Sequence, residues 1–217
     1  MMRVLSVNIG KKRTQPKGNA LEITGIYKTP SDGPVAVGSL GLPGDFIGDV
    51  KDHGGPDQAV YLYGQPDYDW WSAQLGRELQ PGTFGENLTL SDFESARCNV
   101  GDRLQIGSLL LEFTAPRIPC STLARRMGDP QFVKRYRAAE RPGMYCRVIE
   151  QGNVQAGDEV TLIPYAGPTV SSLDVFRANF LAGPDAETIR RVLAAPVAER
   201  ARADFERFLR QLQGASS

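Results

Sequence analysis

The sequence predicts a mainly β protein with short inserted helices and a helical C-terminal segment. Up to about Ile163, short apolar stretches are interrupted by Gly, Pro, Asn and Asp roughly every ten residues, as in strands joined by turns. Beyond a proline-bounded linker at 164–168, apolar residues recur at helical spacing. We therefore expect two domains, a β domain at 1–165 and a helical extension at 168–217.

The β region contains several elements that can be placed from the sequence. Residues 4–9 alternate and predict a first strand, and the apolar and aromatic run 59–63 predicts a buried strand. The stretches 104–106 and 109–113 flank a Gly-Ser turn and predict a hairpin. Start signals and helical spacing predict inserted helices at 66–79, 121–127 and 130–139.

The tail predicts three short amphipathic helices that form a small three-helix bundle. Apolar residues at helical spacing form one stripe on each helix, among them Phe176, Ile189 and Phe205. Such short helices are not stable alone, so each stripe must be buried against the others or against a partner. A homodimer through this face is one expected arrangement.

Composition and charge exclude several classes of function. Lys plus Arg and Asp plus Glu both number 25, so no basic footprint for nucleic acid is visible. No apolar run approaches the ~20 residues of a membrane span, and the N-terminal apolar stretch is too short for a signal peptide. We therefore expect a cytoplasmic protein that binds neither membrane nor nucleic acid.

The three cysteines differ in their surroundings. An odd number at wide spacing implies no disulfide framework, iron–sulfur cluster or structural zinc site. Cys120 precedes a predicted helix and follows Arg117 by three residues, and both features favour the reactive thiolate. The alternative is a small buried apolar residue. For Cys98 and Cys146, packing is the expected role.

Two further stretches carry candidate site residues. His53 is the only histidine and is followed by Gly54 and Gly55, whose backbone permits close approach of a ligand. Many other glycines crowd into 25–64, which indicates closely packed backbone. Gly85 and Asn87 lie in a second stretch that is also compatible with a structural turn.

The stretches that contain His53 and Cys120 can also be combined into one hydrolytic site. Cys120, His53 and Asp57 have the residue types of a Cys–His–Asp hydrolase. Such partners are recognised by their geometry, so the residue types alone do not establish this chemistry.

Four segments in order resemble the MOSC family, named after the C-terminal domain of molybdenum-cofactor sulfurases. They are 53–61 (HGGPDQAVY), 84–88 (FGENL), 100–102 (VGD) and 116–120 (PRIPC). The resemblance covers about residues 20 to 163 and is closest to the small stand-alone, YiiM-like bacterial branch, which also has a three-helix extension. It implies a bent, mostly antiparallel β-barrel. It also implies that Cys120 is the functional cysteine.

The resemblance further implies a molybdenum cofactor, in which a pterin dithiolene holds the metal. Cys120 would ligate molybdenum, and the enzyme would reduce N-hydroxylated compounds such as hydroxylaminopurines from N–OH to N–H. Cys120 and His53 are the expected catalytic residues. The residues expected around the cofactor are Lys51, His53, Gly54, Gly55, Asp57, Gly85, Asn87 and Arg117.

Within this set, roles are assigned by chemistry. Arg117 and Lys51 are candidates for the cofactor's phosphate, Asn87 for the pterin edge, and His53 for positioning the pterin. No glycine fingerprint for flavin or NAD(P)H is present, so electrons are expected from a separate reductase. The chain lacks the aminotransferase-like domain of larger relatives, and we expect no bound pyridoxal phosphate.

Two alternatives to a molybdenum reductase remain open at this point. One is a carrier without catalytic activity that stores the cofactor or passes sulfur as a Cys120 persulfide. The other is a metal-free cysteine hydrolase or transferase.

Overall fold

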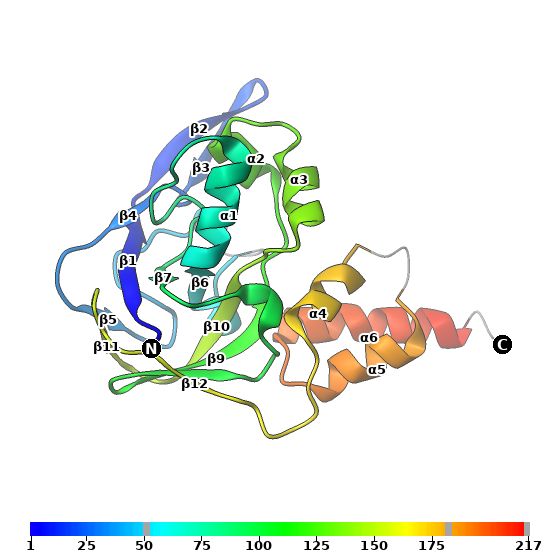
Figure 1. The fold of residues 1–217 in the computed structure, drawn as a ribbon. Helices are drawn as coiled ribbons and strands as arrows, with labels where there is room; N and C mark the ends of the chain where they lie inside the picture. Colours follow the sequence, from blue (N-terminus) through cyan, green and yellow to red (C-terminus); the bar gives the residue numbers. More distant parts are fainter. Residues whose placement is uncertain (50–52, 181–183, 215–217) are drawn as a thin grey trace.

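A computed structural model describes residues 1–49, 53–180 and 184–214, and its main feature is a strongly curved eight-stranded sheet (Figure 1). The strands follow the order β12-β8-β9-β10-β6-β7-β1-β4. Their bounds are β1 Val4–Gly10, β4 Lys28–Pro30, β6 Val60–Gly64, β7 Leu88–Leu90, β8 Arg103–Ile106, β9 Leu109–Pro116, β10 Met144–Glu150 and β12 Thr161–Ile163.

The sheet corrects two expectations. First, β6 and β7 pair in parallel, so the sheet is mixed and the fold is α/β in character. Second, the strand order is open, and no closed barrel is present in the described part of the chain. The curvature nevertheless brings the start of β1 next to the segment before β12, where the N–H of Val4 donates to the backbone oxygen of Asp158 at 2.9 Å. An isolated bridge joins Arg3 to Glu159 beside this bond.

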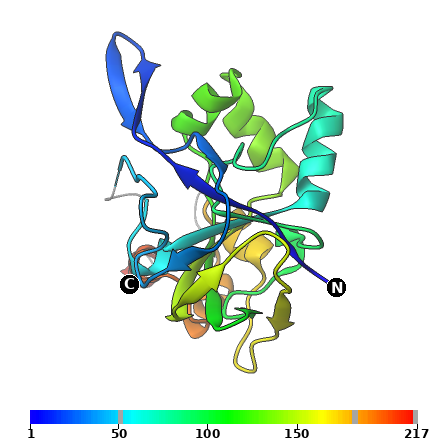
Figure 2. The same cartoon turned by 90° about the vertical axis from the view of Figure 1, so that its left-hand side faces the viewer.

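Two small sheets lie outside the main one. Strands β5 (Val35–Val37) and β11 (Gly152–Val154) pair with each other, and β2 (Arg13–Lys17) pairs with β3 (Ala20–Thr24). Figure 2 shows the β2–β3 hairpin extending away from the body of the protein. The hairpin 104–113 predicted from the sequence is confirmed as β8 and β9.

The three inserted helices are present where the sequence predicts them, and the bounds of α1 and α3 differ from the predicted ones. Helix α2 spans Ser121–Met127 as predicted, and α3 spans Phe132–Ala139. Helix α1, Gln65–Leu75, ends four residues earlier than the predicted Leu79, because Gly76 adopts the left-handed conformation that terminates helices. Two short 3₁₀ helices complete this set, η1 at Pro56–Gln58 and η2 at Ser95–Arg97.

The C-terminal extension, residues 168–180 and 184–214, contains α4 (Ser172–Ala178), α5 (Ala186–Ala194) and α6 (Glu199–Gly214). Its apolar stripes pack onto the core of the sheet rather than only against one another. Val175, Ile189, Val192 and Phe205 belong to the same buried cluster as Phe113 of β9. The division into two domains, 1–165 and 168–217, stays a prediction. None of the described helices is long and apolar enough to span a bilayer.

A second buried cluster is aromatic and connects α1, α2 and α3 to the sheet. Tyr63 of β6 stacks on Phe84 with ring centroids 4.3 Å apart, and Trp71 of α1 donates its indole N–H to the Tyr63 hydroxyl at 2.9 Å. Phe132 and Tyr136 of α3 pack against both Trp71 and Phe84. Edge and stacked ring contacts of this kind add to the stabilisation from burial.

Backbone contacts explain several of the crowded glycines at 25–64. A Cβ atom on Gly25 would lie 1.6 Å from the backbone oxygen of Phe46, and one on Gly64 would lie 1.6 Å from that of Phe93. Gly64 joins β6 directly to α1 and has φ −112°, which any residue can adopt. The backbone conformation therefore does not require glycine at position 64. The close approach of the Phe93 backbone does.

Gly64→Ala should lower the free energy of unfolding by about 3 kcal/mol or more, because backbone atoms cannot move aside as a side chain can. Gly18→Ala is the control. Gly18 has φ +59° and no neighbour within 4 Å, so only its backbone conformation should cost about 1 kcal/mol. Urea denaturation measures both values, and an equal loss in the two variants would contradict the explanation.

Candidate functional site

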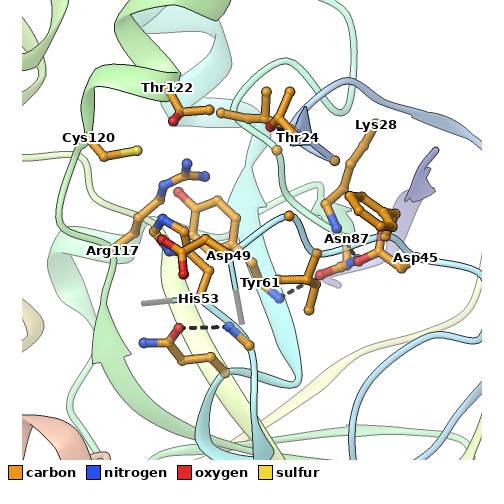
Figure 3. Close-up of a pocket in the computed structure, with 18 of the residues that line it drawn as sticks. Thr24, Lys28, Asp45, Asp49, His53, Tyr61, Asn87, Arg117, Cys120 and Thr122 are labelled. Atoms are coloured by element: carbon orange, nitrogen blue, oxygen red, sulfur yellow. Dashed lines mark hydrogen bonds and ion pairs between the residues drawn. The ribbon is translucent and has the colours of Figure 1, made fainter. Parts of the chain in front are cut away.

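A pocket opens where the β3–β4 connection faces the segment that leads into α2. It contains about 770 Å³ of free space, part of it open to solvent. The structure brings six of the predicted site residues to its wall: His53, Gly54, Gly85, Asn87, Arg117 and Cys120. Four of them, His53, Asn87, Arg117 and Cys120, are labelled in Figure 3. The six residues come from three segments that are far apart in the sequence, 53–54, 85–87 and 117–120, so the curved sheet is required to bring them together.

Cys120 lies directly before α2, and its sulfur points into the pocket near Arg117 (Figure 3). Burial alone would raise the pKa of this thiol. A hydrogen bond with His53 and the positive charge of Arg117 outweigh that effect and lower the pKa to about 6. The thiol is therefore mostly ionised at neutral pH, which is the form that attacks electrophiles or binds soft metals.

Arg117 is a buried cation in the pocket wall. Its side chain is only 5% exposed, donates to the backbone oxygen of Phe84, and lies over the ring of Tyr61 at 5.1 Å from the centroid. Its Nε has no partner in the structure. Burial would lower the pKa of this guanidinium, but the nearby Tyr145, Tyr61 and Cys120 side chains raise it. Arg117 is thus a permanent charge with a free donor.

The loop that carries His53 depends on its paired glycines. Gly54 and Gly55 have φ values of +88° and +84°, a region that side chains disfavour. The N–H of Gly54 donates to the side-chain oxygen of Gln58 at 3.1 Å, which closes the loop. Gly55 is not among the residues of the pocket wall.

Asn87 lines the pocket, but its side chain is already bonded to protein atoms. Its amide oxygen accepts the backbone N–H of Tyr61 at 3.0 Å, and its amide nitrogen donates to Asp45 at 2.9 Å and to Asn8 at 3.4 Å. The preceding Glu86 is buried, and one of its carboxylate oxygens accepts bonds from three partners, Tyr68, Gly82 and Thr89. These bonds support the structural-turn interpretation of this stretch.

Asp57, another predicted site residue, does not line the pocket. The carboxylate of Asp57 faces away from the pocket, bonding Arg147 and the backbone of Glu199. It therefore does not orient His53 as a Cys–His–Asp arrangement would require. Lys51 lies outside the described residues.

The pocket wall contains an ion pair that was not predicted from the sequence. Lys28 and Asp45 are both nearly buried and pair with each other (Figure 3). Burial lowers the pKa of Lys28, and Asp45 opposes that change. Tyr61, interpreted as a core residue, is buried and also lines the pocket. Strand periodicity indicates burial but does not distinguish a core position from a buried position beside a pocket.

Cys98 and Cys146 are placed as the packing interpretation predicts. Both are buried in the main apolar cluster. Burial, with a smaller contribution from Asp102, raises the pKa of Cys98 to about 12, and burial also raises the pKa of Cys146.

Of the three thiols, Cys120 should react with iodoacetamide at pH 7 and the other two should not. Its labelling rate should follow an ionisation near pH 6. His53→Ala removes the hydrogen bond that stabilises the thiolate, so the midpoint should move to higher pH. Peptide mass spectrometry gives the rates, and Cys98→Ala should leave the profile unchanged. A wild-type midpoint at the ordinary thiol value of about 8.5 would contradict the assignment.

Comparison with known proteins agrees with the resemblance seen in the four segments. A model of the MOSC domain matches residues 49–161. The protein YflK of Bacillus subtilis is 33% identical over 204 residues, which cover 93% of this chain and 92% of YflK. A protein from Gibberella moniliformis named "Reductase" is 34% identical over 179 residues, 80% of this chain but 31% of that protein.

The fold comparison gives the same result. The crystal structure of YiiM from Geobacillus stearothermophilus has a TM-score of 0.79 and 26% sequence identity, with 96% of this chain and all of that chain covered. The matched residues 49–161 include His53, Gly85, Asn87, Arg117 and Cys120. The chain belongs to the MOSC domain family.

Proposed function

We propose that this protein binds a molybdenum cofactor through Cys120 and reduces N-hydroxylated compounds from N–OH to N–H. The observation that carries the proposal is the ionised, pocket-facing thiol of Cys120 beside His53 and Arg117. Family membership and the similarity to a protein named reductase support an oxidoreductase activity.

The residues present fit such a cofactor. A thiolate is a soft ligand suited to completing a metal site that already has two pterin sulfurs. No group of three or more His, Cys, Asp or Glu side chains in the described ranges is arranged to hold a metal by itself. A single protein ligand is therefore consistent with a metal that arrives bound to an organic group.

Arg117 is the best-placed residue for the cofactor's phosphate. It is buried, permanently charged and has an unpartnered Nε, whereas the charge of Lys28 is already compensated by Asp45. An arginine can bind phosphate through two parallel bonds. Gly85 supports this position, because a Cβ there would lie 3.2 Å from the Arg117 guanidinium. Lys51 stays a candidate for the same role.

The proposed reaction consumes two electrons and two protons and releases water together with the amine. When bound, the molybdenum cofactor would supply the two electrons. His53 lines the same pocket as Cys120 and is the only imidazole in the chain, so it is the proposed proton donor to the hydroxyl oxygen of the substrate. A separate reductase is the proposed electron source, and a homodimer through the helical extension remains a proposal.

A second candidate function is a carrier of sulfur or of the cofactor. The low pKa of Cys120 and the position of this thiol in the pocket also suit a persulfide. A carrier would gain the mass of one sulfur on Cys120, or would bind the cofactor, without reducing any substrate.

Protein purified from a host that makes the cofactor should contain molybdenum, and Cys120→Ala should lose most of it because the proposed metal ligand is gone. Elemental analysis measures the metal content per chain. Cys98→Ala removes a thiol outside the pocket and should retain the metal. Equal metal content in all three proteins would rule out Cys120 as the ligand.

The metal-containing protein should reduce a hydroxylaminopurine to the aminopurine with a chemical reductant, as followed by chromatography. Cys120→Ala should lower kcat/KM by at least about 100-fold, because the ligand that positions the reacting metal is absent. Normal turnover by this variant would eliminate the reductase proposal. Molybdenum content without turnover in the wild type would favour the carrier.

A further inference from the structure

The carboxylate of Asp57 connects the His53 loop to the C-terminal extension. One oxygen accepts the backbone N–H of Glu199, the first residue of α6, at 2.6 Å. The other pairs with Arg147 of β10 at 3.0 Å. The segment that carries His53 is thereby bonded to a helix that begins 142 residues beyond Asp57.

Helix α6 has no capping side chain immediately before its first residue. That position is Ala198, which has no side-chain oxygen to accept the free N–H groups of the first turn. Asp57 supplies an acceptor from another part of the chain, with a charge that suits the positive end of the helix. Arg147 adds bonds to the backbone oxygens of Pro196 and Val197, at 3.2 and 3.3 Å.

Asp57 is also joined to the pocket wall through η1. Its backbone oxygen accepts the hydroxyl of Thr114 at 2.6 Å. Two residues of the same loop, Gly54 and Gln58, line the pocket and are bonded to each other at 3.1 Å. A continuous path of short contacts therefore runs from α6 through Asp57 and Gln58 to the backbone beside His53.

We propose that the C-terminal extension holds His53 in place beside Cys120 through the bonds that Asp57 makes with α6 and Arg147. Asp57 is a positioning residue here, since its carboxylate faces the helices and not the pocket. The His53 loop needs such an anchor because two consecutive glycines give its backbone wide conformational freedom. The proposal concerns the protein's own side chains and holds whether or not Cys120 binds molybdenum.

The test follows His53 directly by NMR on the full-length protein without added cofactor. His53 is the only histidine among 217 residues, so its imidazole C–H signals need no assignment by mutation. In Asp57→Ala we expect these signals to shift and broaden. Amide hydrogen exchange at residues 53–58 should accelerate at least about tenfold, because the loop opens without unfolding the core. Unchanged signals and exchange would overturn the proposal.

Asp185→Ala is the matched control. Asp185 caps α5 in the same extension by accepting the N–H of Thr188 at 2.8 Å, and it does not touch the His53 loop. This variant should leave the His53 signals and the exchange at 53–58 as in the wild type. An effect equal to that of Asp57→Ala would mean that the extension acts only through general stability, and the proposal would be wrong.

A double variant separates helix stability from positioning. Adding Ala198→Ser to Asp57→Ala gives α6 a capping residue of its own, so the melting temperature should rise while the His53 signals stay perturbed. Recovery of both the melting temperature and the wild-type His53 signals would overturn the proposal. If Asp57→Ala does not fold, Arg147→Gln removes the ion-pair part of the link and leaves the Asp57–Glu199 bond, and it must still shift the His53 signals for the proposal to stand.

Discussion

The electrostatic attraction between the buried Arg117 guanidinium and the groups around it, the Cys120 thiolate above all, is the interaction on which the pocket depends. A buried guanidinium is costly unless acceptors or negative charge surround it. Here the backbone oxygen of Phe84, the ring face of Tyr61 and the Cys120 thiolate provide that compensation. Cation and thiolate therefore stabilise each other, and loss of either would leave its partner uncompensated in a poorly solvated place.

Hydrogen bonds to the backbone, as well as between side chains, fix the positions of the charged groups in the pocket wall. Phe84 lies on a turn that buried Glu86 fixes, and Asn87 uses its whole amide to bond neighbouring strands and Asp45. The free donor of Arg117 and the thiolate of Cys120 are thus presented by a rigid frame. Preorganised groups of this kind bind a charged ligand without first having to reorder.

Local signals predicted much of the fold and part of the site. Gly128 ends α2 where the pattern places it, and the neighbourhood of Arg117 and Cys120 follows from their spacing. The parallel pairing of β6 with β7 was missed, because apolar periodicity carries no strand direction. The Lys28–Asp45 pair and the direction of Asp57 were also missed. Each depends on partners distant in sequence, and charged residues in a turn are usually solvated.

The placement of β1 has a consequence for the order of folding. This first strand lies between β7 and β4, and its beginning also bonds residues 157–160. Residues 157–160 are translated about 150 residues after β1. The hydrogen bonds between the start of β1 and this segment are therefore among the last of the sheet to form, because such long-range contacts are slow to close.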